Sequence, residues 1–103
     1  MIELTDDSHL DEILSDTHKL VFLDFYANWC GPCKRLTPNI VTLEKEYPEC
    51  KFVKIDVDSF PEISEKYSIT CMPTLIFIRN NEILRRIEGA NLDEIRDALV
   101  KLR

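Results

Sequence analysis

The sequence of 103 residues predicts one α/β domain, residues 1–103, with a central mixed sheet of five strands flanked by four helices. Three observations support this. Apolar runs alternate with segments of helical period in the first half, which favours parallel strands joined by helical crossovers. The turn sequence Arg79-Asn80-Asn81 separates the last two apolar runs and predicts an antiparallel hairpin. The apolar content of 45% suits a globular core.

The first third of the chain is expected to form two strands with a helix between them. Met1–Leu4 fits a short edge strand, and Asp7 or Ser8 fits the cap of the following helix. The apolar face of that helix holds Leu10, Ile13 and Leu14. The run Leu20–Ala27 is apolar apart from Asp24, which predicts a central strand covered on both faces.

A long helix and a third strand are expected next. From Cys33 through Glu49, apolar residues recur at helical spacing. They are Leu36, Ile40, Leu43 and Tyr47. Pro38 lies inside this segment and predicts a kink. Alternation in Phe52–Asp58 predicts a strand with Val53, Ile55 and Val57 on one face and Lys54 and Asp56 on the other.

The last third of the chain predicts two helices around a hairpin. Ser59 or Pro61 is expected to open a short helix that carries Ile63 and Tyr67. Thr74–Ile78 and Ile83–Glu88 are the strands of the hairpin, and Gly89 ends the second one. The final helix has one apolar side, formed by Leu92, Ile95, Leu99 and Leu102.

The charge of the chain limits its partners and its compartment. The formal net charge is −6. The first sixteen residues contain no Lys or Arg and six acids, which are Glu3, Asp6, Asp7, Asp11, Glu12 and Asp16. We therefore expect no nucleic-acid partner and no basic leader segment. Because no apolar run approaches the ~20 residues that span a bilayer, we expect a cytoplasmic protein without a membrane segment.

A cysteine pair, Cys30-Gly31-Pro32-Cys33, lies between the predicted central strand and the long helix. This placement is typical of a redox dithiol. If a helix starts between the two cysteines, its free N–H groups favour a thiolate at the first position. A second thiol at this spacing makes the resolution of a mixed disulfide intramolecular.

The alternative is that this cysteine pair has a structural role or binds a metal. A metal needs about four ligands. The other cysteines, Cys50 and Cys71, are single, and His9 and His18 lie far upstream without paired spacing. We therefore expect no metal, and we expect Cys50 to be a small apolar residue at a helix–strand junction.

The stretch from Asp24 to Lys34, DFYANWCGPCK, resembles the active-site segment of the thioredoxin family. Later landmarks follow in order, namely Asp56-Val57-Asp58, Tyr67-Ser68-Ile69, Met72-Pro73-Thr74-Leu75 and Gly89-Ala90-Asn91. The segment around Cys71 resembles eukaryotic cytosolic thioredoxins in particular. The chain departs from the family at Asn81, where many members have glycine, and at Asn28, which is often acidic or hydroxylated. The resemblance implies the thioredoxin fold and a thiol–disulfide oxidoreductase that reduces protein disulfides and serves cell redox homeostasis.

The resemblance also implies roles around the dithiol. Cys30 is the attacking thiol, which we expect to be partly exposed, and Cys33 is the resolving thiol, shielded by the first helical turn. Asp24 accepts and returns the proton of Cys33, in keeping with the raised pKa expected of an acid in a buried strand. The alternatives are that Asp24 is exposed at a strand edge or pairs statically with Lys54. The residues expected to tune the redox chemistry are Gly31, Pro32 and Lys54.

A substrate surface is implied beside the dithiol. The family has a cis-proline at Pro73, which leaves the backbone of Met72 free to pair with an extended substrate. The expected docking residues are Trp29, Gly31, Pro32, Met72, Pro73, Gly89 and Ala90. Core packing is the alternative for Trp29. Cys71 is a candidate regulatory thiol, with an inert thiol as the alternative.

The family implies particular partners as well. These are protein disulfides, including those of peroxiredoxin and ribonucleotide reductase, and thioredoxin reductase, which restores the dithiol. No cofactor is expected, and the protein is expected to be a monomer, with a dimer linked through Cys71 as the alternative. Two rival functions stay open: an oxidising isomerase domain, which typically has histidine where Pro32 stands, and a binding module without turnover.

Overall fold

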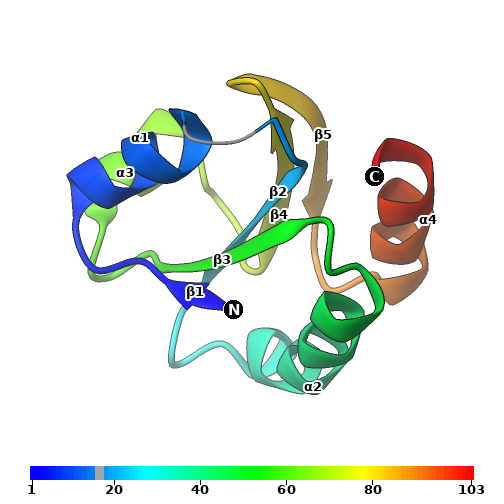
Figure 1. Ribbon diagram of the computed structural model, residues 1–103. Coiled ribbons are helices and arrows are strands. Elements are labelled where there is room, and N and C mark those ends of the chain that lie inside the picture. The colour runs from blue at the N-terminus through cyan, green and yellow to red at the C-terminus, as the bar shows by residue number, and fades with distance from the viewer. Residues whose placement is uncertain (16–17) are drawn as a thin grey trace.

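The computed structural model describes residues 1–15 and 18–103. Within them the chain forms five strands and four helices (Figure 1). In chain order they are β1 (Ile2–Glu3), α1 (Asp7–Ser15), β2 (Val21–Tyr26), α2 (Gly31–Glu46), β3 (Lys51–Asp56), α3 (Pro61–Lys66), β4 (Thr74–Arg79), β5 (Glu82–Glu88) and α4 (Leu92–Leu102). The predicted α/β fold, with a five-stranded mixed sheet and four helices, is confirmed.

The strands lie in the order β1-β3-β2-β4-β5. Strands β1 and β2 run parallel to β3, β4 runs antiparallel to β2, and β5 returns antiparallel to β4. The predicted hairpin turn is present, with Asn80 and Asn81 at φ of 53° and 64°. Asparagine tolerates this left-handed region, so the turn forms without a glycine at position 81.

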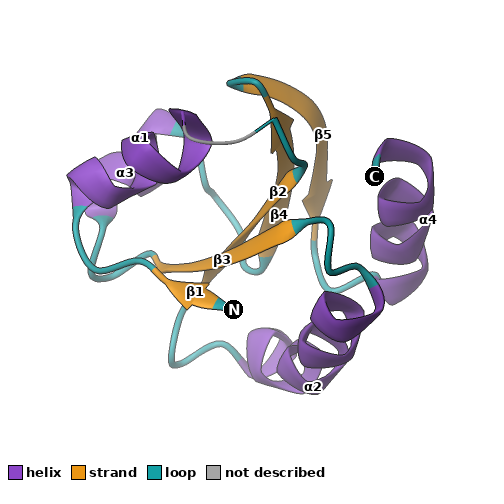
Figure 2. Cartoon of the chain, in the orientation of Figure 1, coloured by secondary structure: helices purple, strands orange, loops and turns teal. Residues whose placement is uncertain are grey.

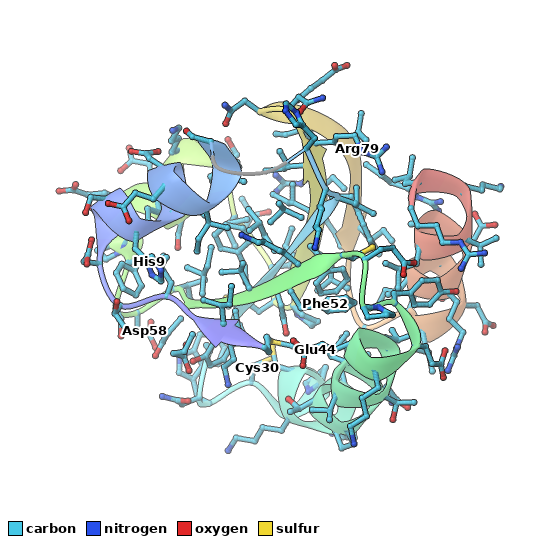
Figure 3. All side chains as sticks on the ribbon, in the orientation of Figure 1. His9, Cys30, Glu44, Phe52, Asp58 and Arg79 are labelled. Carbon is cyan, nitrogen blue, oxygen red and sulfur yellow. A yellow bond between two sulfur atoms is a disulfide. The ribbon has the colours of Figure 1, made fainter. Side chains whose placement is uncertain are left out.

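The sheet carries a helical layer on each face, with α2 and α4 on one side and α1 and α3 on the other (Figure 2). On the α2 side, the ring of Phe22 stacks on Phe52 at 4.9 Å and meets the edge of Phe77 at 5.1 Å. Phe52 lies between the sheet and these helices in Figure 3. On the other face, Leu23 and Phe25 pack with α1 and α3. Strand β2 is therefore covered on both faces, as predicted.

Several expected boundaries are wrong by a few residues. Asp6, rather than Asp7 or Ser8, caps α1, because its Oδ1 accepts the N–H of His9 at 3.0 Å. Helix α2 ends at Glu46 rather than Glu49, since Pro48 disfavours helical backbone at the residue before it.

Two further boundaries concern segments near the dithiol. Helix α2 begins at Gly31, two residues before the expected start, because Cys30 caps it and proline is tolerated in a first turn. Strand β3 spans Lys51–Asp56 rather than Phe52–Asp58, since the chain turns where the N–H of Asp58 bonds Oδ1 of Asp56. Helix α3 begins at Pro61, one of its two predicted starts. Among the helices described, none has the length and apolar character needed to cross a membrane.

Candidate redox-active site

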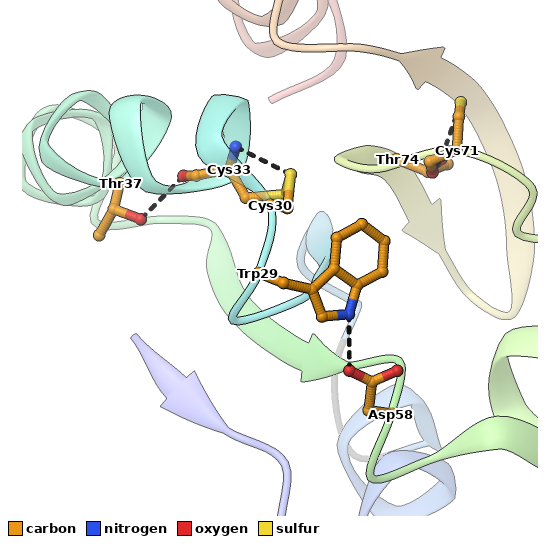
Figure 4. Close-up of a disulfide and its surroundings, with 7 residues drawn as sticks. All are labelled: Trp29, Cys30, Cys33, Thr37, Asp58, Cys71 and Thr74. Atoms are coloured by element: carbon orange, nitrogen blue, oxygen red, sulfur yellow. Dashed lines mark hydrogen bonds between the residues drawn. A yellow bond between two sulfur atoms is a disulfide. The ribbon is translucent and has the colours of Figure 1, made fainter.

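The cysteine pair lies where β2 passes into α2, and the helix begins between the two cysteines, which is the condition under which the first position favours a thiolate (Figure 4). Cys30 is the N-cap of α2, and its Sγ accepts the backbone N–H of Cys33 at 3.1 Å. A disulfide joins Cys30 and Cys33, whose Cα atoms are 5.3 Å apart. When this bond is reduced, the same N–H group and the start of the helix favour negative charge on Sγ of Cys30.

Both cysteines are buried in this disulfide form. Cys33 is 6% exposed, which confirms that it is shielded. Cys30 is 5% exposed, so the expectation that it is partly exposed is wrong. The reason is local packing, because Cys30 and Cys33 form a cluster with Ala27 and Met72 lies against that cluster.

Asp24 lies in the middle of β2 and is 8% exposed. Burial raises the pKa of its carboxyl to about 7, while the positive charge of Lys54 opposes the rise and the negative charge of Glu3 adds to it. This confirms the expected direction of the shift and contradicts an exposed position at a strand edge. The alternative of a static pair with Lys54 is also not observed, since that ammonium pairs with Glu3 at 3.5 Å.

Asp24 and Cys33 line one cavity of about 160 Å³. This volume is ample for a water molecule, which needs roughly 10–15 Å³ by the same kind of measure. Polar groups of Lys54 and Thr37 also line it and provide partners for such a water. The arrangement therefore offers a path for a proton, through this cavity, between the thiol of Cys33 and the carboxyl of Asp24.

A cis peptide bond joins Met72 to Pro73, as the family resemblance implies. The carbonyl oxygen of Pro73 accepts the N–H of Gly89 at 2.8 Å, and Gly89 has a φ of 98° that favours glycine. Because Met72 packs against the cysteine cluster, this turn lies directly beside the disulfide.

Trp29 is 67% exposed, which contradicts the core-packing alternative for this side chain. Its Nε1–H donates to Oδ2 of Asp58 at 2.9 Å, and Figure 4 shows the indole beside the disulfide. Pro32 and Ala90, both exposed, share a hollow of about 290 Å³ between the starts of α2 and α4. The predicted docking residues thus lie around the cysteine pair, and Gly31 among them is partly exposed.

The two remaining cysteines differ in their surroundings. Cys50 is buried between α2 and β3, as expected, and burial raises its pKa. Cys71 is half-buried, with its Sγ 3.4 Å from Oε2 of Glu88 and 3.8 Å from Oγ1 of Thr74. Over residues 1–15 and 18–103, no group of three or more Cys, His, Asp or Glu is arranged to hold a metal ion.

Four residues near the site lie outside the predicted catalytic, redox-tuning and docking sets. Asp58 belongs to the Asp-Val-Asp landmark after β3, and parallel pairing of β2 with β3 brings it beside the dithiol. Glu3 and Tyr26 bond each other, the hydroxyl of Tyr26 donating to Oε2 of Glu3 at 3.0 Å. Asn28 donates to Oδ2 of Asp56 at 3.5 Å. The alternation of β2 and β3 predicts that Tyr26 and Lys54 share one face of the sheet, but it does not predict that Glu3 lies beside them.

Cys30 and Cys33 hold two sulfurs at the start of a helix, joined as a disulfide. A pair of this kind carries electrons between proteins by passing between disulfide and dithiol. The fold and the site therefore define a thiol–disulfide oxidoreductase. The thioredoxin family model matches residues 1–101, and the chain belongs to the thioredoxin family. It is accordingly a protein-disulfide oxidoreductase, with Cys30 and Cys33 as the redox-active pair.

Comparison with individual proteins agrees with this membership. Thioredoxin-2 of Saccharomyces cerevisiae is 38% identical over 97 residues, which are 94% of this chain and 93% of the yeast protein. The solved thioredoxin of Fasciola hepatica superposes with a TM-score of 0.96 at 36% identity, and the match covers 100% of both chains. A chain from a study of thiol resolution in yeast mitochondrial 1-Cys peroxiredoxin by the glutathione and thioredoxin systems has a TM-score of 0.92 and 31% identity, covering 99% of this chain and 95% of that one.

Proposed function

We propose that residues 1–103 act as one domain that transfers electrons to protein disulfides in the cytoplasm, with Cys30 as the attacking thiol. The observation that carries this assignment is the hydrogen bond from the N–H of Cys33 to Sγ of Cys30, because it favours negative charge on that sulfur. Cys33 lies buried in the first turn of α2, which suits the resolving role.

The first step is attack of the Cys30 thiolate on one sulfur of a substrate disulfide. A bond forms between Cys30 and that sulfur, and the substrate disulfide breaks. The second substrate sulfur leaves as a thiolate and takes a proton from solvent. The product of this step is a mixed disulfide between Cys30 and the substrate.

The second step is attack of Cys33 on Sγ of Cys30. Cys33 first gives its proton to Asp24 through the shared cavity. The near-neutral pKa of the Asp24 carboxyl, about 7, favours this transfer. The Cys30–Cys33 disulfide then forms and the substrate leaves as a second thiolate, which Asp24 can protonate. Two electrons and two protons pass to the substrate, and a reductase must return them.

The substrate chain is expected to lie across the turn at Met72 and Pro73, with Trp29, Gly89 and Ala90 as further contacts. Exposure of Trp29 and the fixed turn between Pro73 and Gly89 support this surface. Backbone pairing at Met72 gives affinity that does not depend on the substrate sequence. Gly31 and Pro32 fix the turn between the two sulfurs, and Lys54 acts on Asp24 by its charge.

Peroxiredoxin and ribonucleotide reductase are the partners that we propose as substrates, and thioredoxin reductase is the proposed source of electrons. The match to a chain from the peroxiredoxin study supports the first of these. We further propose that the protein works as a monomer and that Cys71, half-buried beside Glu88, is a regulatory thiol.

Reduction of insulin by dithiothreitol, followed as turbidity, tests the proposed function. The chain is expected to accelerate it, and Cys30→Ser and Cys33→Ser are expected to abolish the acceleration. Cys50→Ala, which removes a cysteine outside the dithiol, is the matched control and is expected to act like the wild type. No acceleration by the wild type would instead favour a binding module without turnover.

A further inference from the structure

Glu3, Lys54 and Asp24 form one row across three neighbouring strands. In the parallel pairing of β1 with β3, Glu3 is the register partner of Lys54. In the parallel pairing of β2 with β3, Asp24 is the register partner of the same lysine. Register partners present their side chains on the same face of a sheet. Lys54 therefore lies between two carboxyl groups, one on an exposed edge strand and one on the buried central strand.

The ammonium of Lys54 pairs with the outer of these two carboxyl groups. Its Nζ is 3.5 Å from Oε1 of Glu3 and 4.7 Å from the centre of the Tyr26 ring. The other oxygen of Glu3, Oε2, accepts the hydroxyl of Tyr26 at 3.0 Å. Tyr26 thus holds Glu3 in place, and both groups hold Lys54. Within the described residues, no ion pair joins Lys54 to Asp24.

We propose that Glu3 is a positioning residue for proton transfer: by holding Lys54 at the outer edge of the sheet, it prevents an ion pair between Lys54 and Asp24 and keeps Asp24 a base strong enough to take the proton of Cys33. This inference rests on the proposed role of Asp24. It adds a residue of the edge strand β1, which β3 separates from the strand β2 that carries Asp24.

The charges around Asp24 agree with this role. Lys54 lowers the carboxyl pKa and Glu3 raises it, against the larger effect of burial. A cation in direct contact lowers the pKa of a carboxyl by about 1–3 units, so the position of one ammonium is sufficient to decide the protonation of Asp24. The other titratable groups around the cavity are Cys33, Lys34, Tyr26 and the amino group of Met1, which pairs with Glu44 at 2.6 Å.

Titration of Asp24 in a Glu3→Gln variant tests the proposal. The readout is the carboxyl carbon of Asp24, followed by NMR against pH in the reduced protein. We expect the midpoint to fall by roughly half to one pH unit, because Lys54 is freed to approach Asp24. Glu12→Gln is the matched control: it removes the same charge from an exposed residue of α1, on the opposite face of the sheet, and is expected to leave the midpoint unchanged.

Two further variants separate positioning from simple repulsion between Glu3 and Asp24. In a Lys54→Met background, Glu3→Gln is expected to move the midpoint by less than half as much as it does when Lys54 is present. Tyr26→Phe removes the hydroxyl that anchors Glu3 without a change of charge, and it is expected to lower the midpoint by a smaller amount. An unchanged midpoint in Glu3→Gln, or an equal shift with and without Lys54, overturns the proposal.

The same measurement keeps this inference distinct from the proposed function. The titration reads the carboxyl of Asp24 directly, whether or not that group takes part in disulfide exchange. If Asp24→Asn resolves mixed disulfides at the wild-type rate, the proton-transfer role of Asp24 fails and the proposal for Glu3 fails with it. If Asp24→Asn is slow but Glu3→Gln leaves both the midpoint and the pH profile of resolution unchanged, only the proposal for Glu3 fails.

Discussion

The backbone of Pro73 is joined to that of Gly89, whose N–H donates to the carbonyl oxygen of Pro73 at 2.8 Å. This hydrogen bond connects the turn before β4 to the end of β5 and so continues the hairpin past its last paired residues. It fixes the cis-proline turn against a rigid sheet. The surface beside the disulfide is therefore set by backbone contacts, which side-chain substitutions on it leave in place.

Replacement of the resolving thiol is expected to trap substrates. In Cys33→Ser the first exchange can occur, but the second cannot, so a mixed disulfide through Cys30 accumulates. Non-reducing gels of the variant with cytosolic extract, followed by identification of the captured proteins, measure this. Cys30→Ser is the control and is expected to capture none. Absence of trapped partners in Cys33→Ser would contradict the proposed order of attack.

The stability advantage of Asp24→Asn over the wild type is expected to grow as the pH rises. The folded carboxyl keeps its proton up to a pH of about 7, whereas an unfolded aspartate loses it near 3.9. Stability is therefore lost as the pH rises from about 4 to about 7, and the variant does not share that loss.

Denaturant unfolding at pH 5 and pH 8 measures this effect of Asp24. The stability advantage of Asp24→Asn over the wild type is expected to grow by about 2–3 kcal/mol between the two values. Asp11→Asn, on the exposed side of α1, is the control and is expected to show no such growth. A constant difference for Asp24→Asn would mean that the carboxyl ionises in the folded protein as it does in the unfolded chain.

Loss of the indole is expected to weaken binding of protein substrates. Trp29→Ala removes the large exposed side chain beside the disulfide, and we expect KM for a protein disulfide to rise about tenfold, or about 1.4 kcal/mol. Asp58→Ala, which frees the indole from its acceptor, is expected to have a smaller effect in the same direction. Val100→Ala, another exposed apolar residue, is the control on α4. A similar loss for a small aromatic disulfide would argue against a docking role.

Pro32→His is expected to make the disulfide more oxidising. An imidazolium in the first turn of α2 adds positive charge near Cys30, which stabilises the thiolate and so the reduced form. A tenfold change in the equilibrium with glutathione corresponds to about 30 mV. Pro32→Ala, which changes the turn without charge, is the control. A shift of the same size in Pro32→Ala would assign the effect to the proline ring instead of the charge.

Much of this fold follows from local patterns in the sequence. The apolar run of β2, the alternation in β3 and the Asn-Asn turn are each set by neighbouring residues, and the structure has all three. The cysteine pair is equally local, since helix caps and prolines in a first turn depend on adjacent residues. The raised pKa of Asp24 was predictable because an acid in an otherwise apolar central strand must be buried.

Features that depend on distant segments were not predictable in this way. The burial of Cys30 depends on Met72, which comes from a turn far along the chain. The row of Glu3, Lys54 and Asp24 depends on β1 pairing with β3, a choice that strand periodicity does not specify. The predicted cap of α1 is wrong for a simpler reason. Asp6, Asp7 and Ser8 follow one another and are all good capping residues, so residue type alone does not select among them.

The shielding of Cys30 affects which molecules can reduce the disulfide of the oxidised protein. Cys30 is 5% exposed and Cys33 is 6% exposed, so an attacking thiol has restricted access to the disulfide. Exchange rates depend on access as well as on driving force. A dedicated enzyme that docks on the surrounding surface can present its thiol to Cys30, and we expect it to reduce the disulfide faster than a freely diffusing small thiol does at the same concentration. Restricted access thereby slows exchange with the bulk thiol pool relative to exchange with a docked partner, even where the reduction potentials are alike.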